Sequence, residues 1–213
     1  MIRLTKTNPP QILVDQGREW TQTLMENIAN GTVTDAQRLR YRDPAIKEAL
    51  KHETSGKCAY CESKILHIAF GDIEHIWPKS VSPELTFEWT NLTLACSVCN
   101  VNKSNNFPRG MNLVNPYTCD PNERFLFLGP LVMAKTGDGG AICTERFLKL
   151  NRTELVLERI KRINALRDYV EAMESATPEV KEMLLALLPD EVASHTEYSG
   201  AAVAALAVMR SNA

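Results

Sequence analysis

Apolar residues recur at helical spacing in the first quarter of the chain. Trp20, Leu24 and Ile28 lie four positions apart, which predicts an amphipathic helix over residues 16–29. Residues 1–13 are expected to be extended, because a Pro-Pro pair blocks helix formation there. A second helix is predicted directly after Asp43, since this aspartate can cap a helix whose first residue is proline.

The middle of the chain instead alternates polar and apolar positions. Residues 72–76 (DIEHI) predict a short strand, and residues 91–95 (NLTLA) predict its partner. Residues 97–105 then predict a short helix, with Asn100 and Lys103 three positions apart on one face. The segment therefore predicts a strand–loop–strand–helix unit.

The next segment predicts more strands. Residues 124–128 (RFLFL) and 130–135 (PLVMAK) are typical of strands, and residues 141–147 are predicted to return as a third strand after the GDGG turn at 137–140. A phosphate loop is the alternative reading of GDGG. The turn lacks the Walker lysine-serine pattern and a predicted following helix, so a hairpin turn is favoured.

The last third of the chain predicts three helices. The first covers residues 151–174, with Asn151 as its cap, Glu154 as the reciprocal residue, and Arg159 among charged residues on a solvated face. Its predicted buried stripe consists of Val156, Ile160, Ile163, Leu166, Val170 and Met173.

The other two helices are shorter. One is predicted to begin at Thr177-Pro178 and to end near Pro189, and the other to begin behind a capping box of Ser194 and Glu197. The final helix (GAAVAALAVM) is small and apolar around much of its girth. Such a surface either packs against the neighbouring helices or docks a partner, and the sequence leaves both open.

Composition and charge narrow the class of protein. The 213 residues are 44% hydrophobic and 23% charged, which indicates one or two globular domains rather than a disordered chain or a membrane protein. The formal net charge is −2, whereas proteins that bind DNA unaided usually carry a basic surface. We therefore expect weak intrinsic affinity for DNA, with something else delivering the substrate.

Four of the six cysteines form two CxxC pairs, Cys58 with Cys61 and Cys96 with Cys99. Tetrahedral structural zinc is commonly held by four thiolates at such a spacing. Two disulfides or four unrelated thiols are the alternatives. The start of the chain has no apolar signal segment, so we expect a cytosolic protein with reduced thiols, which favours zinc.

Groups suited to phosphodiester hydrolysis lie between the cysteine pairs. His75 is the candidate general base, because neutral imidazole with a pKa of about 6.5 can accept a proton from water. The Glu74 carboxylate and the Asn100 amide oxygen are candidate ligands for a hard cation such as Mg²⁺. Adjacent strand residues point to opposite faces, so Glu74 and His75 cannot both point straight into one cleft. A distorted or bulged strand end is therefore predicted. For an isolated Glu-His pair, an ordinary histidine and a surface acid would be the simpler reading.

Three motifs in this order, EHIWP, WTNL and CSVCNVNK, resemble the ββα-metal (HNH) nucleases. The resemblance implies that Asn91 braces the loop of the catalytic histidine and orients its ring. The expected catalytic cation is Mg²⁺ or Mn²⁺, and Lys103 is a candidate contact for phosphate. The chain departs from the common HNH pattern in having Asn100 where the last histidine stands, and Glu74 where aspartate is more frequent. The amide favours a hard metal over zinc at this site.

The predicted fold class is therefore α+β. It comprises an N-terminal helical lead-in (1–56), an HNH ββα-metal core with a four-cysteine zinc knot (57–110), a β-hairpin region (111–150) and a C-terminal helical tail (151–213).

A narrower resemblance extends over nearly the whole chain. The segments GKCAYCE, IEHIWPKS, FEWTNLTLAC, CNVNK, NPY and LNR occur in the order found in PtuB-like nuclease subunits of Septu and retron-associated anti-phage systems. The resemblance implies a bacterial cytoplasmic DNA endonuclease in a hetero-oligomer with an ABC/SMC-like, PtuA-like ATPase. A stand-alone restriction or nicking enzyme and a non-catalytic zinc-binding module are the alternatives. The helical tail and the lead-in are the expected docking surfaces, with Ala201, Ala205 and Val208 as test positions.

Overall fold

The two central segments predicted as strands pair in the computed structural model, which describes residues 1–66, 69–104 and 113–211. β1 (Asp72–His75) and β2 (Leu92–Ala95) are antiparallel, from Asp72 opposite Ala95 to His75 opposite Leu92. All four side chains of β2 are buried. The register is continuous through these four pairs, so the bulge predicted at the end of the first strand is wrong.

Helix α4 (Ser97–Lys103) follows β2 directly and packs against β1. The Cys96 sulfur accepts a hydrogen bond from the Cys99 backbone amide at the start of the helix. The helix ends at Lys103 because Ser104 adopts a positive φ of 42°. The strand–strand–helix order is as predicted, while residue 105 lies outside the described residues.

Three further helical segments belong to the same part of the chain: α1 (Gln11–Asn30), α2 (Asp35–Arg38) and the 3-10 turn η1 (Arg40–Arg42). The first begins five residues before the predicted start, because Pro10 can occupy its N-cap position. It ends at Gly31, whose left-handed φ of 68° suits glycine.

Helix α3 (Pro44–Glu53) packs against strand β2 of the sheet. The Asp43 carboxylate accepts a hydrogen bond from the Ala45 amide at 2.8 Å, which confirms the predicted cap. Ile46 and Leu50 are fully buried, and the helix packs against β2. The sheet is thereby held between α3 and α4.

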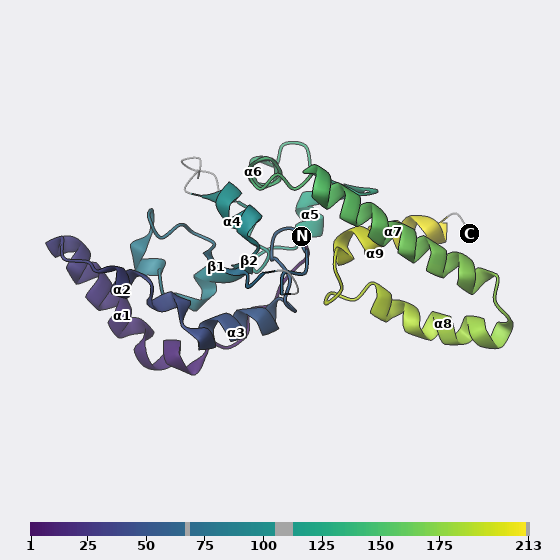
Figure 1. Cartoon of the computed structure of the whole chain (residues 1–213). Helices are drawn as coiled ribbons and strands as arrows, with labels where there is room; N and C mark the ends of the chain where they lie inside the picture. Colours follow the sequence, from purple (N-terminus) through teal and green to yellow (C-terminus); the bar gives the residue numbers. More distant parts are fainter. Residues whose placement is uncertain (67–68, 105–112, 212–213) are drawn as a thin grey trace. The chain divides into compact units, whose positions relative to one another are not determined.

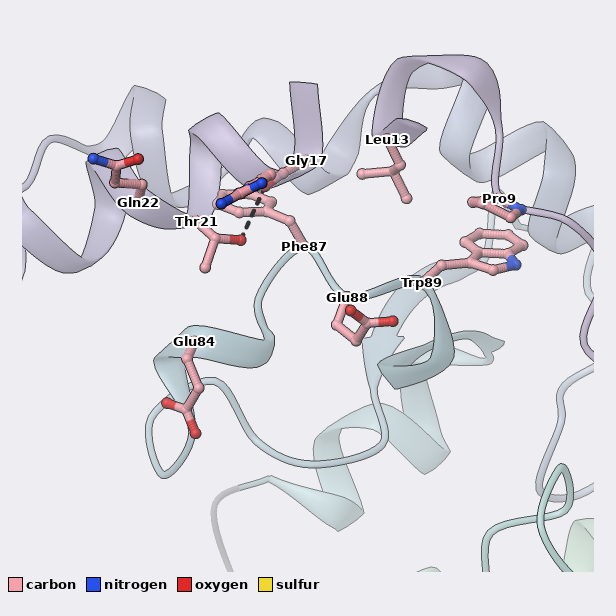
Figure 2. Close-up of a pocket in the computed structure, with 10 residues that line it drawn as sticks. Pro9, Leu13, Gly17, Thr21, Gln22, Glu84, Phe87, Glu88 and Trp89 are labelled. Carbon is pink, nitrogen blue, oxygen red and sulfur yellow. Dashed lines mark hydrogen bonds between the residues drawn. The ribbon is translucent and has the colours of Figure 1, made fainter. Parts of the chain in front are cut away.

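Helix α1 and the segment containing η2 (Pro83–Leu85) and η3 (Trp89–Asn91) enclose a groove of about 500 Å³ (Figure 2). Trp20 meets Phe87 edge to face, with ring centroids 5.5 Å apart. The Trp89 indole N–H donates to the Thr7 carbonyl at 2.7 Å. Trp20, Trp89 and Tyr41 are all buried, so these aromatic residues belong to the core.

The chain divides into two compact units, each with its own core. The elements above belong to the unit formed by Leu4–Ala59 and Lys64–Arg109, and the other unit comprises Met1–Arg3, Tyr60–Ser63 and Gly110–Ala213. The four-region division stays a prediction, and its 110/111 boundary lies outside the described residues. Among the helices described, none is long and apolar enough to cross a membrane.

The second unit contains the predicted hairpin. After the short helix α5 (Pro121–Arg124), β3 (Phe125–Leu128) pairs antiparallel with β4 (Leu131–Ala134). Both predicted strands are confirmed. Gly129, with a φ of 56°, makes the turn between them.

The third strand predicted over residues 141–147 is wrong, because this segment is helix α6 (Gly139–Phe147). Asp138 caps the helix by accepting from the Ala141 amide at 2.9 Å, and it also pairs with Arg124. Ala141, Thr144 and Leu148 are fully buried at helical spacing. The glycine-rich turn thus precedes a helix rather than a strand.

Helix α7 (Thr153–Glu174) forms where predicted, but its cap and its buried face differ. Asn151 does not cap it; the Asn151 amide instead bonds the Val132 N–H at 2.9 Å and the Val132 carbonyl at 2.7 Å. Arg159 is buried rather than solvated and donates to the carbonyls of Pro130 and Leu150. Ile160, predicted as buried, is 38% exposed. The need to satisfy these backbone carbonyls brings the arginine inward.

Helices α8 (Pro178–Glu191) and α9 (Ser199–Ser211) complete this unit, and α7 packs against both (Figure 1). Helix α9 begins later than predicted, so the capping box of Ser194 and Glu197 is wrong. Its first residues bond the Glu62 carboxylate instead, at 3.0 Å from the Ser199 hydroxyl and 3.1 Å from the Gly200 amide. The cap therefore comes from a residue far away in sequence.

The small-residue face of α9 is mostly core. Ala201 and Ala202 are buried, and Leu206 joins Leu166 and Leu188 in a cluster between the helices. Val208 is 60% exposed. A charge at residue 201 would consequently unfold the helical layer, whereas residue 208 is available to a partner.

Removing the Asp138 carboxylate should destabilise the second unit. We expect Asp138→Ala to lower the free energy of unfolding by about 1–2 kcal/mol, because it removes the α6 cap and the partner of Arg124. Urea denaturation followed by circular dichroism measures the change. The exposed Asp190→Ala is the matched control and should shift stability by less than about 0.5 kcal/mol. Equal effects of the two substitutions would contradict the assignment of the cap.

Candidate active site

The four cysteines of the two CxxC pairs come together. The sulfur atoms of Cys58, Cys61, Cys96 and Cys99 all lie within 4.8 Å of one another, and none is in a disulfide. A tetrahedral ion with metal–sulfur bonds of about 2.3 Å places its ligands roughly 3.8 Å apart. The donor set and its spacing therefore fit a structural thiolate metal site.

The cysteine cluster is continuous with the strand–strand–helix unit. Cys96 follows the last residue of β2, and Cys99 is inside α4. The Ala59 amide donates to the Leu94 carbonyl at 2.9 Å, so the first cysteine turn is attached to β2. Any ion bound here would fix where α4 begins relative to the sheet.

A buried ion pair joins α4 to β1. The Lys103 ammonium lies 2.6 Å from Glu74 Oε1, and it also donates to the His75 carbonyl at 2.6 Å. The side chains of Lys103 and Glu74 are 2% and 9% exposed, so the pair is shielded from water. Burial raises the pKa of Glu74, and the neighbouring Lys103 charge partly offsets that effect.

Asn100 lies one turn before Lys103 on the same helix. Its amide nitrogen donates to Asp72 Oδ2 at 3.0 Å. This bond fixes the orientation of the amide, because the nitrogen is turned toward Asp72 and the oxygen is turned away. Asp72 shares a strand face with Glu74, so both carboxylates lie on the side of β1 that meets α4.

His75 occupies the opposite side of the strand. Its Nε2 lies 3.0 Å from the Thr86 carbonyl, and the Tyr41 ring packs edge to face on the imidazole at 4.6 Å between centroids. Burial lowers the pKa of His75 to about 4, and the positive charges of Lys79 and Lys103 act in the same direction. The imidazole is therefore neutral at physiological pH, with Nε2 protonated toward the carbonyl and Nδ1 as the acceptor.

Asn91 holds the loop between β1 and β2. Its side-chain oxygen accepts from the Trp77 amide at 2.7 Å, and its nitrogen donates to the carbonyls of Trp77 and Leu85 at 3.1 and 3.0 Å. The Asn91 carbonyl also accepts from Ile76 at 2.8 Å. The side chain thus connects the residues after His75 with those before Thr86, the residue that His75 contacts.

The predicted residues are thus brought together in two groups. Glu74, Asn100 and Lys103 lie on the α4 side of the sheet, while His75 lies on the opposite side of β1, next to the loop that Asn91 holds. Lys103, expected to contact phosphate, is buried against Glu74 and the His75 backbone instead.

Sequence reasoning missed Asp72, Thr86 and the contact between Tyr41 and His75. The strand period of two could have identified Asp72, which is two residues before Glu74. Thr86 contacts His75 through its backbone carbonyl, so the identity of its side chain could not have indicated this role.

Comparison with known proteins agrees with this geometry. The sequence model of the HNH endonuclease family matches residues 58–106, so the chain carries an HNH endonuclease domain. Septu protein PtuB of Bacillus thuringiensis is 27% identical over 221 residues, covering 97% of this chain and 82% of that protein. Septu protein PtuB of Bacillus mycoides (strain KBAB4) is 30% identical over 152 residues, covering 57% of this chain and 52% of that protein.

Removing the Asn91 amide should loosen the loop after β1. We expect Asn91→Ala to cost about 2–4 kcal/mol of stability, because it leaves buried backbone groups of Trp77 and Leu85 without their partner. Hydrogen exchange should increase over residues 76–86 and stay unchanged in α7. The exposed Asn122→Ala is the matched control. Unchanged protection of the Trp77 amide in Asn91→Ala would contradict the role of Asn91.

Proposed function

We propose that this PtuB-like HNH nuclease hydrolyses phosphodiester bonds of DNA with a hard divalent cation, as the nuclease component of a bacterial anti-phage system. The observation that supports this proposal best is a single strand–strand–helix unit that carries a neutral, buried histidine on one side of β1 and a carboxylate with an oriented amide on the other. The presence of both an oxygen ligand set and a proton acceptor is what metal-assisted hydrolysis requires. It also argues against a zinc module without catalysis.

His75 would act as the general base. Its Nε2 is held by the Thr86 carbonyl, which leaves Nδ1 to accept a proton from the attacking water. The Tyr41 ring and the Asn91 loop fix the plane of the imidazole. Holding the base in one orientation reduces the entropy lost on reaching the transition state.

Glu74 and Asn100 would hold the cation, which is Mg²⁺ or Mn²⁺ by the chemistry of the donors. Carboxylate and amide oxygens suit a hard ion, and such an ion supplies charge neutralisation at the phosphate and the leaving oxygen. Glu74 Oε1 is paired with Lys103, so Oε2 is the oxygen we assign to the cation. Asp72 directs the Asn100 amide oxygen outward through its bond to the nitrogen.

Lys103 is best described as a positioning residue. Its ammonium bonds both the Glu74 carboxylate and the His75 carbonyl, and it is too deeply buried to be a surface contact for phosphate. It would hold the base and the carboxylate at a fixed separation along β1.

A partner would deliver the substrate. A formal net charge of −2 leaves few cations for neutralising phosphates, which is the main source of affinity for DNA. By its similarity to Septu PtuB proteins, we infer a complex with a PtuA-like ABC/SMC-like ATPase in the bacterial cytoplasm, where cysteine thiols stay reduced. The exposed side of α9 around Val208 is one docking surface to test.

Replacing the proposed base should abolish cleavage without loss of the fold. His75→Ala should reduce the rate of Mg²⁺- or Mn²⁺-dependent DNA cleavage by about 10²–10⁴-fold, because a positioned base is lost. Asn100→Ala should raise the concentration of cation needed for half-maximal rate. The assay uses the chain together with its proposed ATPase partner. The exposed His52→Ala is the matched control. Wild-type cleavage by a folded His75→Ala protein would refute the assignment.

The cysteine cluster should hold one zinc ion per chain. We expect Cys99→Ser to lose this zinc and to unfold at lower temperature, because structural zinc contributes on the order of 10 kcal/mol to folding. Cys143→Ser, outside the cluster, is the matched control. Elemental analysis of purified protein measures the ion directly, and wild-type protein free of zinc would rule out the zinc knot.

A further inference from the structure

A polar pocket of about 350 Å³ opens beside the candidate active site. Its walls include Tyr41, Arg42, Lys47, Phe70, Asp72 and Asn100. Asn100 is also a proposed cation ligand, so the pocket adjoins the position where the reacting phosphate would lie. It is distinct from the groove of Figure 2, which none of the proposed catalytic residues lines.

The pocket combines two cations with one anion. The Lys47 ammonium donates to the Gly71 carbonyl at 2.7 Å, which holds the charge at the pocket wall. The Arg42 side chain is exposed, with its guanidinium 5.9 Å from the Tyr41 ring centroid. The Asp72 carboxylate is hydrogen-bonded to the Asn100 amide. The balance of these three charges is positive, unlike that of the whole chain.

Phe70 is the most exposed large apolar residue among the described residues, with 84% of its surface accessible. Covering an exposed phenylalanine ring with an apolar or aromatic partner is favourable, because it removes apolar surface from water. A ring beside cations and hydrogen-bonding groups matches the sites that bind unpaired nucleotides, where a base stacks on an aromatic side chain and cations follow the phosphates. The volume of the pocket is also in the range of sites for small ligands.

We propose that this pocket binds an unpaired nucleotide of a single-stranded nucleic acid, with the base stacked on Phe70 and the adjoining phosphate near Arg42 and Lys47. A base inside an intact duplex is stacked on its neighbours, so it cannot cover Phe70 without leaving the helix. The site therefore selects single-stranded or locally opened substrate. This inference rests on the proposed function, since it names the form of substrate that the same site accepts.

Binding to single and double strands tests the inference directly. The full chain, without added divalent cation and at about 50 mM salt, is titrated into a labelled DNA strand of about 12 nucleotides and into its duplex. Wild-type protein should bind the strand more tightly than the duplex. Phe70→Ala should weaken strand binding by about 5- to 150-fold, which corresponds to the loss of one stacked base. Val14→Ala, at another exposed apolar position, should bind as wild type does.

Two further variants separate stacking from a change of structure. Phe70→Trp should retain strand binding, and its added indole fluorescence should be quenched by the strand beyond the quenching of wild type. Lys47→Gln should reduce the salt dependence of strand binding by about 0.7 in log–log slope, the value expected for one phosphate contact. Lys51→Gln, one turn further along the same helix, should not.

The inference is overturned if wild-type protein binds no strand, if the duplex binds at least as tightly, or if Phe70→Ala stays within two-fold of wild type. The cleavage assay keeps it separate from the proposed function. Loss of cleavage in His75→Ala together with unchanged strand binding in Phe70→Ala would remove the nucleotide site and keep the nuclease. Weakened binding in Phe70→Ala with normal cleavage by His75→Ala would keep the nucleotide site and remove His75 as the catalytic base.

Discussion

The arrangement of the candidate active site depends on one buried ion pair, between Lys103 at the end of α4 and Glu74 on β1. The same ammonium also bonds the His75 carbonyl, so one side chain fixes the carboxylate and the backbone of the proposed base. Removing one member of such a pair typically costs about 3–5 kcal/mol, because the other charge stays buried without compensation. The position of α4 against β1 is therefore strongly constrained.

This constraint divides the chemistry between the two sides of β1. Glu74, Asp72 and Asn100 form an oxygen-rich side next to α4, and His75 is enclosed on the other side by Tyr41, the Thr86 carbonyl and the loop that Asn91 holds. Burial keeps His75 neutral, as a proton acceptor must be. The ion pair holds the end of α4, and a metal ion on the cysteine cluster would hold its start as well.

The sequence predicted the parts that follow from local patterns. The paired CxxC motifs predicted the cluster, alternation predicted β1 and β2, and Asp43-Pro44 predicted the start of α3. The sequence-based predictions were wrong where a residue distant in sequence determines a helix cap or the burial of a side chain. Asn151 bonds β4 instead of capping α7, Glu62 caps α9 in place of Ser194, and Arg159 turns inward to reach two carbonyls. Residues 141–147 form a helix that Asp138 caps. The glycine-rich pattern around Asp138 predicts a hairpin turn instead, so this cap was missed.

A double-mutant cycle on Glu74→Gln and Lys103→Met tests most directly whether this ion pair organises the site. The free energy of unfolding is measured in urea for wild type, both single variants and the double variant. We predict a coupling free energy above about 1.5 kcal/mol, with the double variant more stable than the sum of the single effects allows. Additive effects within about 0.5 kcal/mol would show that Glu74 and Lys103 act independently, which contradicts the account.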